Sequence, residues 1–195
     1  MSLPLHIPPR PLLLVGNGPS LLGKRLGPVI DNFPHVARLN SYKTEGFELD
    51  VGTRTSIWVR SRRLPTIQPR ATADAIWIAI PHSLRTSTNV AAAFALLGDA
   101  SDRAMVIPRD DVARDLQTAI YDSEDGGEWP STGLLAIAHA IDGGGEVTIA
   151  GFDSWSTEPF HYYGPHDRTG THHDPARERA HIQDLVQAGV VEALR

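Results

Sequence analysis

Cysteine is absent from the 195-residue sequence. Its absence excludes disulfide bonds, cysteine-ligated zinc, iron–sulfur clusters and a thiol nucleophile, and it fits a reducing compartment. Long apolar runs are also missing, since none approaches the roughly 18 residues of a membrane-spanning helix. The first eleven residues carry His6, Arg10 and four prolines, whereas a signal peptide needs an apolar stretch there. We therefore expect a soluble cytoplasmic protein without a membrane span.

Basic residues are fewer than acidic ones. The chain has 18 lysines and arginines against 23 aspartates and glutamates, which gives a formal net charge of -5. A general nucleic-acid binder neutralises many phosphates with lysine and arginine, so the charge balance argues against a nucleic-acid polymer as partner. Hydrophobic residues make up 41% of the chain and charged residues 21%, which is ordinary for a globular protein and excludes intrinsic disorder. At this length we predict a single domain over residues 1–195 that begins with an extended segment over residues 1–11.

Short apolar runs, rich in β-branched residues, recur along the chain and have the length of β-strands. They are mostly apolar without alternation, which is typical of strands that are covered on both faces. The predicted strands are residues 12–15, 36–39, 55–59, 75–80, 104–107 and 146–150.

Helical patterns fall between the predicted strands, and Gly189 follows the last of them as a stop signal. Strands that alternate with helices require crossover connections, so we predict an α/β fold with a mainly parallel sheet and helices on both faces. Residues 153–174 are polar and aromatic and hold four of the nine histidines, which indicates a long functional loop over the carboxyl ends of the strands. The clearest predicted helices are residues 88–97, 110–121, 132–141 and 175–188.

A turn with two glycines, Gly16 and Gly18, follows the first predicted strand and would let the backbone approach a ligand. Leu21 stands where a dinucleotide-binding fingerprint needs its third glycine, and no Gly-Lys-Ser/Thr follows, so neither that fingerprint nor a P-loop is supported. A tight turn between a strand and a helix is the alternative interpretation.

Ser131 or Thr132 can cap the helix predicted over residues 132–141, and the backbone N–H groups at its start could hold a phosphate. A simple helix cap without a ligand is the alternative. An exposed helix end contributes only about 0.3–1 kcal/mol per charge, so tight phosphate binding needs side chains as well.

Histidines and a carboxylate gather toward the end of the chain, where His161 precedes the adjacent pair His172 and His173, and Glu178 follows. Histidine is the natural general base near neutral pH, and a neighbouring carboxylate can fix its tautomer. A metal site with ligands from His161, His166, His172 and His173 is one alternative, although no H-E-x-x-H motif is present. Solvated surface histidines are the other.

The order of several segments is more informative than any one of them. Residues 13–23 (LLVGNGPSLLG), 26–31 (LGPVID), 36–40 (VARLN) and 46–55 (GFELDVGTRT) together resemble the large sialyl motif of glycosyltransferase family 29, the animal-type sialyltransferases. Residues 130–136 (PSTGLLA) with 146–152 (EVTIAGF) are similar to the small motif, residues 160–163 (FHYY) to the third motif, and His173 with Glu178 to the very small motif. On this resemblance the chain is identified as a short, soluble, bacterial-like member of that family.

The resemblance implies a Rossmann-like sheet, as a variant of the GT-A-like arrangement, and a metal-independent inverting transfer from a CMP-sugar donor. The sugar would be sialic acid or a related ulosonic acid, the acceptor would be a small molecule, and no separate cofactor is implied. Carried over by position, His173 would be the general base, His161 would face the phosphate, and Glu178 would support the loop that carries His173. The implied nucleotide-binding residues are Asn17, Gly18, Ser20, Asn40, Ser131, Thr132, Gly133, Gly151, Phe152 and Tyr162.

Departures from the family pattern leave alternatives open. The disulfide that usually joins the large and small motifs is absent, with Leu12 and Gly144 near its positions, and the acid that usually follows the third motif is Gly164. The stretch between Ser61 and Trp129, where acceptor binding is expected, is short. Hydrolysis of a CMP-sugar or of a nucleotide's glycosidic bond is therefore one alternative, and a non-catalytic CMP-binding protein is another.

Overall fold

The computed structural model describes residues 11–62, 73–122, 127–153, 159–164 and 172–194. The extended segment predicted over residues 1–11 therefore lies outside the described residues except for Pro11, and so does His166. Of the helices within the described ranges, none is both long enough and apolar enough to cross a membrane.

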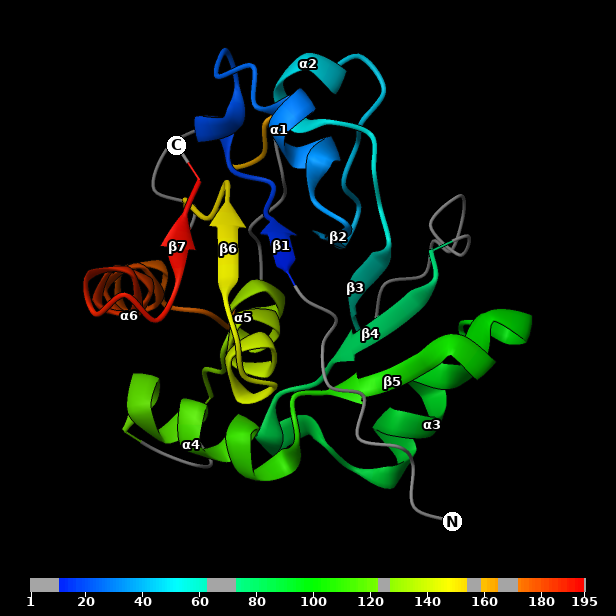
Figure 1. Ribbon diagram of the computed structural model, residues 1–195. Helices are drawn as coiled ribbons and strands as arrows, with labels where there is room; N and C mark the ends of the chain where they lie inside the picture. The colour runs from blue at the N-terminus through cyan, green and yellow to red at the C-terminus, as the bar shows by residue number, and fades with distance from the viewer. Residues whose placement is uncertain (1–10, 63–72, 123–126, 154–158, 165–171, 195) are drawn as a thin grey trace.

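A seven-stranded sheet runs through the molecule with the strand order β5-β4-β3-β2-β1-β6-β7 (Figure 1). Every neighbouring pair of strands is parallel, which confirms the predicted α/β fold class. The strands are β1 (Leu12–Val15), β2 (His35–Leu39), β3 (Ile57–Ser61), β4 (Ala75–Ala79), β5 (Ala104–Ile107), β6 (Val147–Ala150) and β7 (Glu192–Ala193).

Most predicted strands agree with the observed ones to within one residue, and the two differences have physical causes. β3 lies two residues later than predicted, because its pairing with β4 continues through Arg60 and Ser61, which lie opposite Ile78 and Ala79. β7 was not predicted, since it is only two residues long and too short for a hydrophobic pattern.

Helices cover both faces of the sheet, as predicted (Figure 1). The predicted helices correspond to α3, α4, α5 and α6, whereas α1 and α2 were not predicted because they are too short to show a helical period. The helices are α1 (Gly27–Asn32), α2 (Glu48–Val51), α3 (Ser87–Ala95), α4 (Asp110–Tyr121), α5 (Thr132–Asp142) and α6 (Pro175–Gln187).

Successive residues of the central strands point into hydrophobic clusters on opposite faces of the sheet. Leu12 and Leu14 of β1 belong to the cluster that includes residues of α4, α5 and α6. Leu13 and Val15 belong instead to the cluster with residues of α1 and α2. Trp58 of β3 lies in a third cluster with residues of α3. Because both faces of β1 are buried, its side chains are apolar at every position.

The strand order reverses at β1. After β1 the chain places β2, β3, β4 and β5 in succession on one side, and it then returns to place β6 and β7 on the other. The connections that follow β1 and β6 therefore leave the same edge of the sheet in opposite directions and open a crevice, which is where parallel α/β proteins bind ligands. The glycine turn after β1 lies at this point.

Arg38 on β2 is completely buried and holds the connection between α2 and β3. Its guanidinium donates to the carbonyl oxygen of Val51 at 2.6 Å and to that of Arg54 at 2.9 Å. Its guanidinium carbon also lies 5.7 Å from the centre of the Tyr42 ring, within the range of a cation–π contact. A buried cation with such partners fixes the backbone around it.

Replacing Arg38 by methionine should lower the free energy of unfolding by about 2–4 kcal/mol, because two carbonyl oxygens lose buried donors and packing is lost. Arg114→Met is the matched control, since Arg114 is half-exposed on α4 and lies 3.8 Å from Asp115 in a surface ion pair. Such a pair contributes about 0–1 kcal/mol, so the control should scarcely change stability. Urea denaturation of both variants measures the difference, and equal losses would contradict this role of Arg38.

Candidate active site

A cleft of about 380 Å³ opens at the carboxyl ends of β1, β2, β3 and β6. The start of α5 and of α6 and the segment over residues 160–163 complete its walls. It therefore lies where the strand order reverses. The lining residues are Gly16, Asn17, Gly18, Leu39, Asn40, Ser41, Ser61, Ser131, Thr132, Gly133, Gly151, Phe152, Asp153, Phe160, His161, Tyr163, His173, Glu178 and Ile182.

All the predicted site residues line this cleft except Ser20 and Tyr162. They come from parts of the chain that are far apart in the sequence: the strand ends near residues 17, 40 and 151, the start of α5, and the segments that hold His161 and His173. A shared binding site requires this convergence, and the parallel sheet produces it by bringing the carboxyl ends of the strands to one edge.

The turns after β1 and β6 are in close backbone contact. The N–H of Gly16 donates to the carbonyl oxygen of Ala150 at 2.8 Å, and that of Gly18 donates to Gly151 at 2.9 Å. A Cβ atom on Gly16 would lie 2.3 Å from the carbonyl oxygen of Gly151, closer than any side chain allows. Glycine is therefore required here so that the two turns can approach and form the floor of the cleft.

Ser20 lies beside the cleft and is exposed. Its backbone N–H donates to the carboxylate of Asp153 at 2.8 Å, and its hydroxyl donates to the same carboxylate. Asp153 lines the cleft but was not among the predicted residues, because its partner Ser20 is 133 positions away and no local pattern marks it. Ser20 therefore joins the turn after β1 to the turn after β6.

Two asparagines link neighbouring strand ends. Asn17 is buried, and its side-chain Nδ2 donates to the carbonyl oxygen of Leu39 at 3.1 Å. Asn40 has a positive φ of 48°, a conformation that asparagine tolerates well, and its Oδ1 accepts from the N–H of Ser61 at 2.9 Å. With Oδ1 engaged in this way, the other end of the Asn40 amide is a hydrogen-bond donor and suits an anionic group in the cleft.

The start of α5 combines a helix cap with an aromatic wall. Ser131, one of the two predicted capping residues, is the N-cap, and its Oγ accepts from the N–H of Leu134 at 3.2 Å. The first N–H groups of a helix have no partner within the helix, so those at Thr132 and Gly133 are suited to an anion. A Cβ atom on Gly133 would lie 3.0 Å from the Phe152 ring, so the glycine allows that ring to pack against the helix start.

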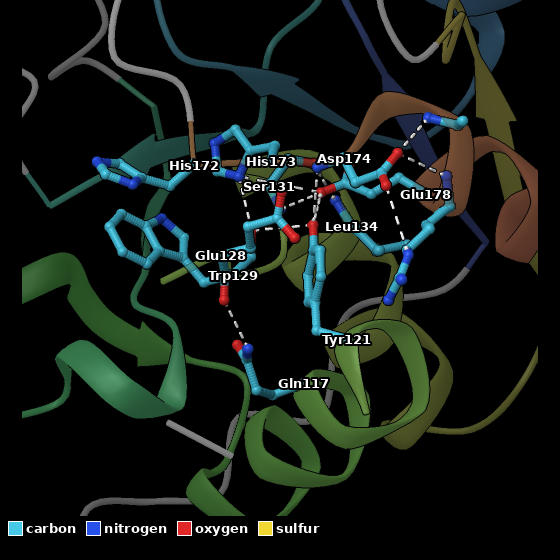
Figure 2. Close-up of polar contacts among 12 residues, drawn as sticks. Gln117, Tyr121, Glu128, Trp129, Ser131, Leu134, His172, His173, Asp174 and Glu178 are labelled. Carbon is cyan, nitrogen blue, oxygen red and sulfur yellow. Dashed lines mark hydrogen bonds and ion pairs between the residues drawn. The ribbon is translucent and has the colours of Figure 1, made fainter. Parts of the chain in front are cut away.

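His173 lies at the cleft on the segment that precedes α6 (Figure 2). Its Nδ1 is 2.6 Å from the carbonyl oxygen of Trp129. Because a carbonyl oxygen only accepts, Nδ1 carries the proton and the neutral ring has its lone pair on Nε2. Burial lowers the pKa of His173, against a smaller opposing effect of the Trp129 carbonyl, so the ring is neutral at pH 7. A neutral imidazole with a fixed tautomer is the form that a general base needs.

Glu178 on α6 is almost completely buried and joins three segments. Its Oε1 accepts from the N–H of Ser131 at 2.7 Å and lies 3.3 Å from the hydroxyl of Tyr121 on α4. The same oxygen is 4.0 Å from Nδ1 of His173. Burial raises the pKa of Glu178 to about 7, although the hydrogen bonds from Ser131 and Tyr121 oppose that shift. The carboxylate therefore contacts both the α5 cap and the segment of His173, and the supporting role of Glu178 stays a prediction.

Tyr162 packs away from the cleft, in the cluster beneath α1 and α2. Its hydroxyl accepts from the N–H of Lys43 at 3.2 Å and donates to the carbonyl oxygen of the same residue. Its neighbours His161 and Tyr163 line the cleft, with ring centres 5.0 Å apart. The hydrogen bonds of the Tyr162 hydroxyl to Lys43 anchor this segment near the end of β2.

The histidines expected as alternative metal ligands engage separate partners. Nδ1 of His172 lies 3.1 Å from the carbonyl oxygen of Gly127, and its ring stacks on Trp129 with ring centres 4.2 Å apart. His173 bonds instead to the Trp129 carbonyl oxygen. Within the described ranges, no three histidine, aspartate or glutamate side chains gather as a metal site would need.

Comparison with known proteins gives matches over most of the chain. A sequence model described as Glycosyltransferase family 29 (sialyltransferase) matches residues 13–190. The Mus musculus protein named CMP-N-acetylneuraminate-beta-galactosamide-alpha-2,3-sialyltransferase 2 is 30% identical, over 93% of this chain and 56% of that protein. The Homo sapiens CMP-N-acetylneuraminate-beta-1,4-galactoside alpha-2,3-sialyltransferase is 26% identical, over 95% and 57%. The chain thus spans little more than half the length of these relatives.

A solved structure also matches this fold. The crystal structure of a mammalian sialyltransferase in complex with Gal-beta-1-3GalNAc-ortho-nitrophenol superposes with a TM-score of 0.65 at 20% identity, covering 94% of this chain and 68% of that one. At this identity the match shows that the two chains share a fold.

Replacing Gly16 by alanine should lower the free energy of unfolding by about 1–3 kcal/mol, because the new Cβ would force the turns after β1 and β6 apart. Gly127→Ala is the matched control, since a Cβ there would meet nothing within 4 Å. Thermal unfolding compares the two variants. Equal melting temperatures would contradict the close contact of these turns.

Glu178→Gln tests the buried carboxyl through the pH dependence of stability. Its pKa is raised from 4.5 to about 7, so the folded chain binds a proton that the unfolded chain releases at lower pH. This contribution is complete below pH 4.5 and is lost as the pH rises through 7. Between those limits the wild type should lose up to about 3 kcal/mol more of its unfolding free energy than the glutamine variant.

Urea denaturation at pH 4.5, 6 and 7.5 measures this difference. Glu45→Gln, at an exposed glutamate, is the control and should follow the wild type. If the unfolding free energy of Glu178→Gln depends on pH as steeply as that of the wild type, the raised pKa of Glu178 is contradicted.

Proposed function

Because this chain belongs to glycosyltransferase family 29, we propose that it binds a CMP-sugar in the cleft and transfers the sugar to a small acceptor that bears a hydroxyl group. The observation that carries the proposal is the convergence of the turn after β1, the start of α5 and His173 on one cavity. The sugar is sialic acid or a related ulosonic acid, in keeping with the donor that the names of the relatives carry.

The nucleotide has suitable partners in the lining. The Phe152 ring, packed against Gly133, offers an aromatic face for the base, and stacking of this kind contributes about 1–3 kcal/mol. The α5 start and the amide of Asn40 provide neutral hydrogen-bond donors for the phosphate. His161 lines the same cavity and can add a charge-assisted hydrogen bond when it is protonated.

The transfer itself needs one group on each side of the anomeric carbon. The bond from that carbon to the phosphate oxygen breaks, and its electron pair leaves with CMP, whose charge His161 and the α5 start stabilise. The acceptor oxygen forms the new bond from the opposite face and gives its proton to Nε2 of His173. A single displacement inverts the anomeric configuration and needs no second carboxylate as nucleophile. In this proposal the reaction needs no metal ion.

Calorimetry with the wild-type chain tests donor binding. CMP should bind more tightly than UMP, AMP or GMP, and a chelator should leave the affinity unchanged. Tighter binding of UMP or AMP, or loss of binding with the chelator, would contradict the donor assignment.

His173→Gln should keep its affinity for CMP but lose transfer by about 10²–10⁴-fold, because the acceptor proton has no base. His35→Gln is the matched control, since His35 lies at the amino end of β2, away from the cleft. Product analysis with CMP-sialic acid and a galactoside measures the rate. Free sialic acid as the main product would identify a hydrolase, and CMP binding without turnover in the wild type would identify a binding protein.

A further inference from the structure

Tyr121, the last residue of α4, lies among the groups that surround the proposed base. It is buried, and Figure 2 shows its side chain reaching from α4 toward Asp174 and Glu178. Its hydroxyl oxygen is 3.3 Å from the Trp129 carbonyl oxygen, 3.3 Å from Oε1 of Glu178 and 3.2 Å from the backbone nitrogen of Asp174. No motif in the sequence marks this tyrosine.

The hydrogen-bonding capacity of a phenol limits how these three partners can be used. The hydroxyl accepts from the Asp174 N–H and has a single proton to donate. That proton can go either to the Trp129 carbonyl oxygen or to the Glu178 carboxylate. An ionised Glu178 is the stronger acceptor, so the proton goes to Glu178 when that residue is charged.

Both of these acceptors also face Nδ1 of His173. The Trp129 carbonyl oxygen accepts from Nδ1 at 2.6 Å, and Oε1 of Glu178 lies 4.0 Å from the same atom. The backbone nitrogen that donates to Tyr121 belongs to Asp174, the residue directly after His173. The Tyr121 hydroxyl therefore contacts both acceptors that face the Nδ1–H of His173 and the backbone N–H of the next residue.

We infer that Tyr121 is a positioning residue for the base: its hydroxyl donates to the ionised Glu178 carboxylate and holds that carboxylate beside His173. This inference rests on the proposed function, in which His173 accepts the proton of the acceptor hydroxyl. When Nε2 takes that proton, the ring becomes a cation whose Nδ1–H faces the Trp129 carbonyl oxygen. The Glu178 carboxylate stabilises the cation only when it is ionised.

The charges around this pair come from several elements. Asp174 raises the pKa of Glu178, whereas the hydrogen bonds from Ser131 and Tyr121 lower it. His172 lowers the pKa of His173 and Glu128 raises it.

Arg177 on α6 is the cation beside these groups. Its guanidinium donates to the carbonyl oxygen of Ile120 on α4. Guanidinium nitrogens of Arg177 also lie 3.4 Å from the carboxylate of Asp174 and 3.9 Å from that of Asp122.

The form that reacts has His173 neutral and Glu178 ionised. Burial lowers the pKa of His173 and raises that of Glu178 to about 7, so the last proton to leave the pair belongs to Glu178. Loss of the Tyr121 hydroxyl removes a hydrogen bond that favours the carboxylate. The acid limb of the pH–rate profile should then move to higher pH.

Tyr121→Phe tests this inference, because it keeps the ring and removes only the hydroxyl. The kcat for transfer from CMP-sialic acid should fall about two- to fivefold at pH 7, because a smaller fraction of Glu178 is ionised there when its pKa moves up from about 7. The acid limb of the pH–rate profile should move to higher pH by about half to one unit, and at high pH the rate should approach that of the wild type. KM for the donor and the Kd of CMP should stay within about twofold.

Tyr42→Phe is the matched control, because Tyr42 packs over Arg38, outside the cleft lining. Its pH–rate profile should match the wild type. A rate loss in Tyr121→Phe that is equal at every pH would indicate a merely structural role and overturn the inference, as would an unchanged rate. Failure of the wild type to bind CMP would instead refute the proposed function.

The double variant Tyr121→Phe/Glu178→Gln tests whether the tyrosine acts through the carboxylate. In the Glu178→Gln background the added loss of the hydroxyl should not move the acid limb further, since the group that titrates is gone. A further shift of the acid limb in the double variant, equal to the shift in Tyr121→Phe alone, would overturn the inference.

An NMR titration of the His173 ring protons in the single variant Glu178→Gln does not depend on the folding of Tyr121→Phe. In the wild type the His173 ring signals should show a second inflection near pH 7, where Glu178 ionises beside Nδ1, and Glu178→Gln should remove that inflection. A second inflection that persists in Glu178→Gln, or that is absent from the wild type, would overturn the inference.

Discussion

The site depends on one buried interaction, the hydrogen bond from the N–H of Ser131 to the carboxylate of Glu178 at 2.7 Å. Ser131 is the N-cap of α5, and Glu178 lies in the first turn of α6. The bond therefore fixes the helix start that faces the cleft relative to the segment that carries His173. A buried carboxylate is costly unless it is paired, and Glu178 accepts from Ser131 while it lies near both Tyr121 and His173. The same group thus stabilises the fold and sets the charge beside the proposed base.

The second constraint is the approach of the turns after β1 and β6. Cysteine is absent, so no disulfide joins the two motif regions, and β1 and β6 are held together by sheet pairing and by backbone contacts through Gly16 and Gly18. Asn17 then links β1 to the end of β2, and Ser20 links its turn to Asp153. Backbone donors and small side chains leave room for a ligand where a bulky residue would fill the cleft.

Much of the fold could be predicted from the sequence, because strands buried on both faces give continuous apolar runs and long helices give a clear period. β7 and the short helices α1 and α2 could not, since each is too short to show a period. The site residues came from motif order, and the cleft contains most of them. Tyr162 was expected at the nucleotide, but its side chain packs against Phe47, with ring centres 5.2 Å apart. Asp153 and Tyr121 were missed because their partners are 133 and 57 positions away, a relation that only the folded chain reveals.

The central claim is that three distant parts of the chain form a single CMP site. An NMR titration with CMP tests it most directly, by following the amide signals of Gly18 and Thr132 together with the ring signals of His173. The account predicts that all three shift on one binding curve with one affinity. Shifts confined to other parts of the molecule, or different affinities at the three positions, would contradict it.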